Sequence, residues 1–456
     1  MAIKLIVFVI IVAVAFAYFC PCLHKDVEIP VLKDGWWGKI PADGKIPADD
    51  TSIRSFTVPY KESDVKDLHE RLSRARLSEP LENVQFQYGF NTNYLKEIIT
   101  YWRTKYDWKK QVNELNKFQQ YITQIEGISV HYIHVKPKIT NKKIRILPLM
   151  LIHGWPGSVV EFYKIIPLLT TPKQGRDYVF EVICPSIPGY GFSEPPHQPG
   201  FNMFDAARIF NKLMDRLKHK NYYVQGGDWG SAIATAMSAI YSNRVTGVHL
   251  NMILGDFNCN SIFKLLIGMI NPNWVMGAED QKYSYPIIDK LMVLLRETGY
   301  LHIQATKPDT VGVGLSDSPA GLAAYILEKF STWTHKNNIN AVDGGLTKYH
   351  NLDELLNNVM VYWVTNSITS SVRFYKENMA EKVLNMKLNK LPVHVPAAIA
   401  IFPNDLYNSP RITIERQFRN LTQYTHMPRG GHFAAMEEPA LLAEDIWKFA
   451  EILQKS

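Results

Sequence analysis

The residues best suited to do chemistry lie in the segment Gly226-Gly227-Asp228-Trp229-Gly230. This is the Gly-x-Ser-x-Gly pattern of a nucleophile elbow, with aspartate in place of serine. A strand-like run precedes it and a helix-like run of small residues follows it. Glycines at this spacing permit a sharp turn that side chains would obstruct. Glycine-flanked aspartates are also common in ordinary turns, so the motif alone leaves a purely structural role open.

The order of residues along the chain favours catalysis. In proteins with this kind of elbow, the nucleophile comes first, an orienting acid next and a histidine last. Asp405 follows an apolar run that ends near Ile401, and His432 lies in the segment Arg429-Gly430-Gly431-His432-Phe433. The Asp405 carboxylate can fix the tautomer of the imidazole and stabilise the imidazolium.

Other carboxylates compete for the role of the acid. Asp256 follows the strand predicted at 245–250, where some proteins of this fold carry the acid, but we favour Asp405. Glu437 and Glu438 follow His432 closely, and we expect them to cap the last helix.

An aspartate nucleophile narrows the reaction class. A serine that opened an epoxide would be left as an ether, which activated water cannot cleave. An aspartate is left as an ester, whose carbonyl carbon water can attack, so the enzyme is regenerated. The residue type therefore indicates alkyl transfer, either opening of an epoxide or displacement of a halide, rather than ordinary ester hydrolysis.

Two further features suit such a reaction. The segment 153–157, His-Gly-Trp-Pro-Gly, ends a predicted strand, and the backbone N–H groups of Trp155 and Trp229 could form an oxyanion hole. A phenol that stays protonated could donate to the departing epoxide oxygen. The residues alone do not choose among the candidates, which are Tyr283, Tyr285, Tyr300, Tyr325, Tyr349, Tyr362 and Tyr375.

Alternating strands and helices must position these groups. From residue 128 onward, short apolar runs alternate with helical patterns, which predicts a mostly parallel sheet with helices on both faces. The segment 257–390 loses the strand pattern and is predicted to be a helical cap inserted between the two parts of the core, 128–256 and 391–456. The predicted strands are 128–135, 146–152, 178–184, 222–225, 245–250 and 393–401.

The N-terminal part is of a different kind. Residues 5–19 carry no charge, and the apolar stretch continues to Leu23, which approaches the roughly 20 residues that span a bilayer. We expect residues 1–23 to be a membrane anchor. A cleaved secretory signal is the alternative, because Ala15-Phe16-Ala17 resembles a cleavage site. Residues 24–127 are predicted to form a meander and helices, the latter at 63–76 and 94–106.

Composition excludes several functions. The net charge is +7, but the basic residues are scattered, so we expect no nucleic-acid partner. The four cysteines show no C-x-x-C pair or metal-ligand spacing, so we expect no disulfide framework, inert buried thiols, no metal and no organic cofactor.

The chain resembles the microsomal epoxide hydrolases, and within them the insect juvenile hormone epoxide hydrolases. The likeness runs along nearly the whole chain. It is clearest in Trp36-Trp37-Gly38, HGWPGS at 153–158, GGDWGS at 226–231, GYLHIQATKPDTVG at 299–312, SPAGLAAYILEKFSTWT at 318–334, SVRFYKEN at 371–378 and RGGHFAAMEEP at 429–439.

The resemblance implies an α/β-hydrolase fold and hydrolysis of a lipophilic epoxide to a diol. It also implies that Tyr300 and Tyr375 donate to the epoxide oxygen and that Asp405 is the acid, where many members carry glutamate. Finally, it implies an anchor in the endoplasmic reticulum membrane with the catalytic part in the cytosol. The alternatives are a haloalkane dehalogenase, which shares the Asp-Trp elbow, and a carrier of apolar epoxides without catalysis.

Overall fold

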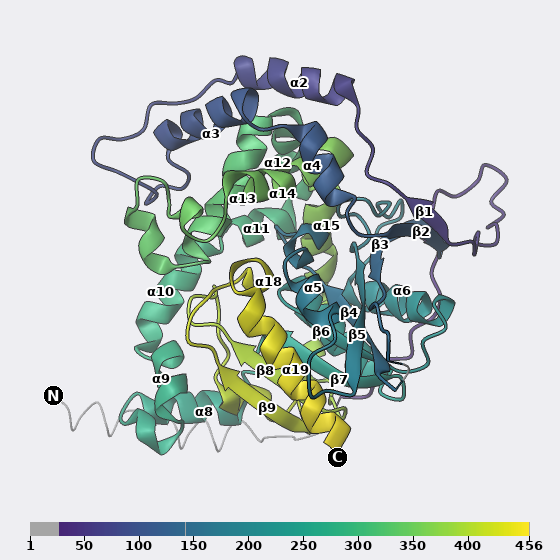
Figure 1. Ribbon diagram of the computed structural model, residues 1–456. Coiled ribbons are helices and arrows are strands. Elements are labelled where there is room, and N and C mark those ends of the chain that lie inside the picture. Colours follow the sequence, from purple (N-terminus) through teal and green to yellow (C-terminus); the bar gives the residue numbers. More distant parts are fainter. Residues whose placement is uncertain (1–26, 142, 456) are drawn as a thin grey trace.

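A nine-stranded sheet runs through the protein in the computed structural model, which describes residues 27–141 and 143–455 (Figure 1). The strand order is β1-β2-β3-β5-β4-β6-β7-β8-β9. β1, β2, β3 and β5 pair antiparallel, and all pairs from β5 to β9 are parallel. The strands are β1 (Arg54–Phe56), β2 (Gln120–Ile125), β3 (Ile128–Val135), β4 (Arg145–Ile152), β5 (Tyr178–Pro185), β6 (Tyr222–Gly226), β7 (Val245–Asn251), β8 (Ala397–Ile401) and β9 (Leu421–His426).

The register of the parallel strands brings their carboxyl ends to one edge. Ile152 at the end of β4 is in register with Gly226 of β6, and Gly226 is in register with Leu250 of β7. Leu250 is in turn in register with Ile399 of β8. The loops that follow these strands therefore emerge side by side, where ligands bind in open α/β sheets.

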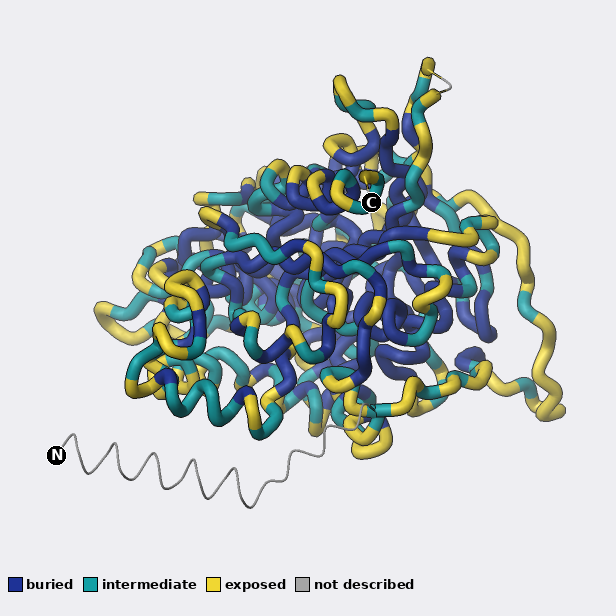
Figure 2. Tube along the Cα trace, turned by 90° about the horizontal axis from the view of Figure 1, so that it is seen from below, coloured by how far each residue is buried: buried dark blue, intermediate teal, exposed yellow. Residues whose placement is uncertain are grey.

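Helices cover both faces of the sheet, so its central strands are buried (Figure 2). α6 (Met203–Arg216) and α7 (Trp229–Ile240) belong to one apolar core, whereas α5 (Ile165–Thr170) and α19 (Pro439–Lys455) belong to a second. Every residue of β5, β6 and β8 is buried, as expected for strands enclosed on both faces. The alternating pattern predicted from the sequence is confirmed, and the core has the α/β-hydrolase fold.

The chain between β7 and β8 is helical. Its helices α11, α12 and α15 pack against one another above the carboxyl edge of the sheet (Figure 1). The Asn358 side chain donates to the Pro156 carbonyl, which joins this helical layer to the loop after β4. The helices are α8 (Cys259–Gly268), α9 (Ala278–Ser284), α10 (Ile287–Glu297), α11 (Gly299–Thr306), α12 (Pro308–Asp317), α13 (Pro319–Thr332), α14 (Leu352–Thr365), α15 (Ile368–Asn378) and α16 (Glu381–Leu384).

Three N-terminal helices lie against this helical layer (Figure 1). They are α2 (Glu62–Ser73), α3 (Thr92–Thr104) and α4 (Trp108–Leu115). Tyr101 of α3 and Gln111 of α4 both donate to the carboxylate of Asp353 on α14. The N-terminal segment thus helps to fix the helices that face the sheet edge.

Some predictions from the sequence need correction or lie outside the structure. The predicted anchor, 1–23, falls among the residues that are not described. Within residues 27–141 and 143–455, no helix is long and apolar enough to span a membrane. β1, β2 and β9 were not predicted. The expectation of inert thiols is right for the buried, free Cys184 and wrong for Cys259, which is disulfide-bonded.

Candidate active site

Asp228 lies in a strained turn between β6 and α7. Its backbone has φ 52° and ψ −129°, a conformation that is costly for a residue with a side chain. A Cβ atom on Gly226 would collide with the Gly230 carbonyl, and one on Gly230 would collide with the Ile152 carbonyl. The glycines that suggested an elbow in the sequence are therefore required by the close approach of the backbone.

Two backbone N–H groups hydrogen-bond to the Asp228 carboxylate. The Trp155 N–H donates to Oδ1 at 2.8 Å, and the Trp229 N–H also hydrogen-bonds to the carboxylate. Burial raises the pKa of Asp228, whereas the nearby His432 and these two N–H groups oppose that rise. The arrangement places an anion, or a developing oxyanion, against two fixed donors.

His432 lies between Asp228 and Asp405. Its Nε2 atom is 3.6 Å from Oδ2 of Asp228, and its Nδ1 atom is 2.7 Å from Oδ1 of Asp405. Burial alone would lower the pKa of His432, but the two carboxylates raise it to about 9. Asp256, the competing candidate, instead accepts a hydrogen bond from Asn258. The structure thus brings together the three residues that the chain order singled out.

The turn that presents His432 is fixed by Glu437. This carboxylate accepts the N–H groups of Gly431 at 3.0 Å and Phe433 at 2.8 Å, one on each side of the histidine. The prediction that Glu437 caps the last helix is therefore wrong. Glu438 is instead paired with Arg429 at 2.7 Å. Glu437 was missed because nothing in the sequence indicates that the chain folds back onto its own turn.

Tyr300 and Tyr375 extend from the helical layer to the same place. Tyr300 on α11 stacks on the Trp155 ring, with centroids 5.1 Å apart and planes 9° apart. The Tyr375 ring on α15 lies edge-on to both Trp155 and Trp229, at 5.8 Å and 4.9 Å. Burial raises the pKa of both phenols well above 10, and the Asp228 charge adds to this, so both remain protonated donors.

The other candidate tyrosines are placed differently. The Tyr362 hydroxyl donates to the Gly157 carbonyl, and the Tyr285 hydroxyl donates to the Leu265 carbonyl. Tyr325 also touches Trp155 with its ring, but its hydroxyl accepts a hydrogen bond from Gln304. The Tyr375 hydroxyl, in contrast, is buried and makes no hydrogen bond of standard geometry within the part of the chain that the structure describes. A ligand oxygen in this position would satisfy it.

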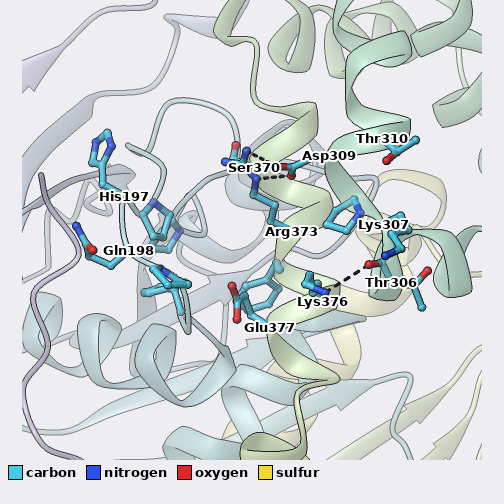
Figure 3. Close-up of a pocket in the computed structure, with 16 residues that line it drawn as sticks. His197, Gln198, Thr306, Lys307, Asp309, Thr310, Ser370, Arg373, Lys376 and Glu377 are labelled. Carbon is cyan, nitrogen blue, oxygen red and sulfur yellow. Dashed lines mark hydrogen bonds and ion pairs between the residues drawn. The ribbon is translucent and has the colours of Figure 1, made fainter.

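A groove lies between the helical layer and the loop after β5 (Figure 3). It has a volume of about 480 Å³ and includes the ion pair between Arg373 and Asp309, together with Lys376 and Glu377. None of the predicted catalytic residues lines it. Phe374 does line it, and the Phe374 ring also contacts Trp229 at 5.2 Å. This charged groove is therefore distinct from the aromatic surroundings of Asp228.

One group of potential metal ligands occurs among the described residues, and it lies elsewhere. His134, Glu181 and His219 have their ligand atoms within 4.8 Å of one another. The Nε2 atoms of His134 and His219 are 2.6 Å and 3.6 Å from the Glu181 carboxylate, and the two histidines together lower the pKa of Glu181 to about 2. None of the three lines the small cavity that Asp228 and His432 share.

Comparisons with known proteins identify the family. The family model described as epoxide hydrolase N terminus matches residues 53–162, and the model described as alpha/beta hydrolase fold matches residues 148–439. Epoxide hydrolase 1 of Oryctolagus cuniculus is 49% identical over 435 residues, which cover 94% of this chain and 95% of the relative. Juvenile hormone epoxide hydrolase 1 of Ctenocephalides felis is 46% identical over 457 residues, covering 99% and 97%.

A solved structure agrees with this. The crystal structure of juvenile hormone epoxide hydrolase from Bombyx mori matches with a TM-score of 0.89 at 40% identity, covering 92% of this chain and 99% of that one. On the sequence matches, the shared fold and the residues gathered at the sheet edge, the chain belongs to the epoxide hydrolase family of α/β-hydrolase-fold enzymes.

Proposed function

We propose that the enzyme converts a lipophilic epoxide and water to a vicinal diol through a covalent ester on Asp228. The observation that carries this proposal is the geometry of one carboxylate. Oδ1 of Asp228 accepts the Trp155 N–H, whereas Oδ2 faces His432 at 3.6 Å. Oδ2 is therefore free to attack an epoxide carbon while Oδ1 becomes the ester carbonyl oxygen inside the oxyanion hole.

In the first half-reaction, Oδ2 forms a bond to an epoxide carbon and the bond from that carbon to the ring oxygen breaks. The resulting alkoxide takes a proton from Tyr300 or Tyr375, whose pKa values above 10 keep them protonated until then. Two donors from different helices suit an oxygen that gains charge as the ring opens.

In the second half-reaction, His432 acts as a base. While Asp228 is ionised, its charge helps to raise the pKa of His432 to about 9, so the imidazole of the resting enzyme is protonated. Alkylation removes that charge, so the pKa falls and the imidazolium can return a proton to the phenolate. The neutral imidazole then accepts a proton from water, and Asp405 stabilises the charge that forms.

Hydrolysis of the ester returns every catalytic group to the protonation state it had in the resting enzyme. Hydroxide adds to Cγ of Asp228, and the bond from Cγ to the product oxygen then breaks. The imidazolium protonates that oxygen to complete the diol. The proton left on the new carboxyl group passes to His432 and restores the ion pair between Asp228 and His432.

The surroundings of Asp228 support the proposed class of substrate. The rings of Trp155, Trp229, Tyr300 and Tyr375 contact one another at this place, and aromatic faces favour an apolar ligand. We therefore propose a lipophilic epoxide, either a juvenile-hormone-like terpenoid or a xenobiotic arene or alkene oxide. Relative kcat/KM for one substrate of each kind separates the two.

We also propose that residues 1–23 anchor the protein in the endoplasmic reticulum membrane with the catalytic part in the cytosol. The uncharged run at 5–19 supports this proposal. Protease treatment of intact microsomes tests it, because a cytosolic catalytic part is digested without detergent and a lumenal one is protected.

Oxygen-18 labelling tests the covalent route. A single turnover of the purified enzyme in oxygen-18 water, followed by mass spectrometry of the Asp228 peptide and of the diol, should give labelled Asp228 and an unlabelled first diol. Label in the first diol with none in Asp228 would show that water attacks the epoxide directly. Release of halide from a chlorinated alkane, with no diol from any epoxide, would favour the dehalogenase reaction instead.

A further inference from the structure

A small cavity lies directly beside Asp228. Its volume of about 20 Å³ is enough for one water molecule, and it is lined by both Asp228 and His432. Glu161, Gln225 and Asn251 add polar side chains to the lining. A buried water needs two to four polar partners, and this cavity offers them.

Glu161 is the acidic residue of this cavity that the mechanism above does not use. It lies on the short 3-10 helix η1 (Val159–Phe162), just after the loop that carries the Trp155 N–H. A Cβ atom on Gly157 would collide with the Glu161 carboxyl, so the carboxyl fills the space that a side chain at 157 would take. The missing side chain at 157 therefore leaves room for the carboxyl beside the nucleophile.

The Glu161 carboxyl interacts electrostatically with both Asp228 and His432. Burial raises the pKa of Glu161 to about 8, the His432 charge lowers it and the Asp228 charge raises it. Glu161 in turn helps to raise the pKa of His432. At neutral pH the carboxyl is therefore mostly protonated, and its carbonyl oxygen remains a hydrogen-bond acceptor.

We propose that Glu161 positions the water that hydrolyses the Asp228 ester. The carbonyl oxygen of Glu161 accepts one O–H of the water in this cavity, and Nε2 of His432 accepts the other. With both protons held, a lone pair of the water oxygen is directed at Cγ of Asp228. His432 takes its proton as the oxygen–Cγ bond forms, and the proton held by Glu161 stays on the attacking oxygen.

This inference rests on the covalent route proposed above, and it assigns Glu161 to the second half-reaction only. Opening of the epoxide needs Asp228 and a phenol, neither of which depends on a water in this cavity. Loss of the Glu161 acceptor should therefore slow ester hydrolysis and leave ester formation unchanged. A general loss of structure would slow both steps.

The test compares Glu161→Leu, which removes the acceptor, with Glu161→Gln, which keeps a neutral carbonyl oxygen in the same place. Rapid quenching and intact-protein mass spectrometry follow the alkyl-enzyme during one turnover of an epoxide such as styrene oxide. For E161L we expect hydrolysis to slow by about 10²-fold, because one partner that orients the attacking water is lost. The alkyl-enzyme should then accumulate, at a formation rate within about threefold of the unmodified enzyme. E161Q should hydrolyse its ester within about threefold of the unmodified rate.

Tyr300→Phe serves as the contrasting variant, because it should slow ester formation rather than hydrolysis. If E161L does not fold, Gly157→Ala provides a second route, since the added Cβ must displace the Glu161 carboxyl from the cavity; it should also slow hydrolysis. Ester hydrolysis at the unmodified rate in E161L or G157A would overturn the assignment, and so would a loss in E161Q as large as in E161L. If the unmodified enzyme forms no ester, it is the covalent route that fails.

Discussion

The Nε2 atom of His432 lies 3.6 Å from Oδ2 of Asp228, so the two residues interact through their charges without a direct hydrogen bond. This separation suits two successive roles. In the proposed covalent route, the imidazolium of the resting enzyme stabilises the Asp228 carboxylate that attacks the epoxide. After alkylation, Nε2 faces the ester and can accept a proton from a water placed between them.

Replacing Asp228 with Asn should lower the pKa of His432 from about 9. The carboxylate charge favours the protonated imidazole, so its removal favours the neutral form, by about one pKa unit or more at this distance. NMR titration of the labelled imidazole measures the shift. Asp256→Asn serves as the control, because Asp256 hydrogen-bonds to Asn258 and should leave the titration unchanged. An unshifted pKa in the D228N variant would contradict the proposed coupling.

Asp405→Asn should slow ester hydrolysis by about 10²- to 10⁴-fold. The amide cannot stabilise the imidazolium as a carboxylate 2.7 Å from Nδ1 does, and it can present a donor to Nδ1 and select the wrong tautomer. Quenched-flow measurement of the alkyl-enzyme checks this, since the ester should form and then persist. The matched variant Asp256→Asn should turn over within about threefold of the unmodified enzyme. Loss of turnover in D256N alone would transfer the role of the acid to Asp256.

Chain order made much of this site predictable. An elbow, a carboxylate after a strand and a late histidine occur in a fixed sequence in this fold, so Asp228, Asp405 and His432 could be selected among many similar residues. The alternation of buried strands with helices likewise predicted the central sheet, because strands enclosed on both faces are almost entirely apolar.

The remaining site residues and strand β9 could not be predicted, because they depend on tertiary contacts. Glu161 lies in an apolar segment without a motif, and its position in one cavity with Asp228 appears only in the folded chain. Glu437 acts on the turn just before it, whereas its position suggested a helix cap. Strand β9 (Leu421–His426) is partly exposed and rich in polar residues, so its sequence lacks the pattern of a buried strand. Tyr300 and Tyr375 could not be chosen from the residues alone; only the family resemblance singled them out.

Removing either phenol should slow ester formation. Tyr300→Phe or Tyr375→Phe takes away one of two donors to the departing oxygen, which we expect to cost roughly 10²-fold in the alkylation rate. The double variant Y300F/Y375F should form the ester more slowly than either single variant. Hydrolysis of any ester that does form should change little. Tyr285→Phe is the matched control, because its hydroxyl donates to the Leu265 carbonyl, and both rates should stay within about twofold. Equal alkylation rates in all four variants would exclude the phenols as donors.

A buried ion pair joins α6 to the turn between β2 and β3. The Arg208 guanidinium on α6 binds both oxygens of Glu126 at 2.7 Å and one oxygen of Asp205 at 2.8 Å. Arg208 and Glu126 expose only 5% and 3% of their side chains, so Arg208→Met would leave a buried carboxylate without its main partner. The free energy of unfolding should fall by about 3–5 kcal/mol. The matched variant Arg74→Met breaks an exposed pair with Glu70 and should cost below about 1 kcal/mol, because solvent screens that pair. Denaturant titration of both variants measures the difference, and equal losses would show that burial does not set the strength of the Arg208 pair.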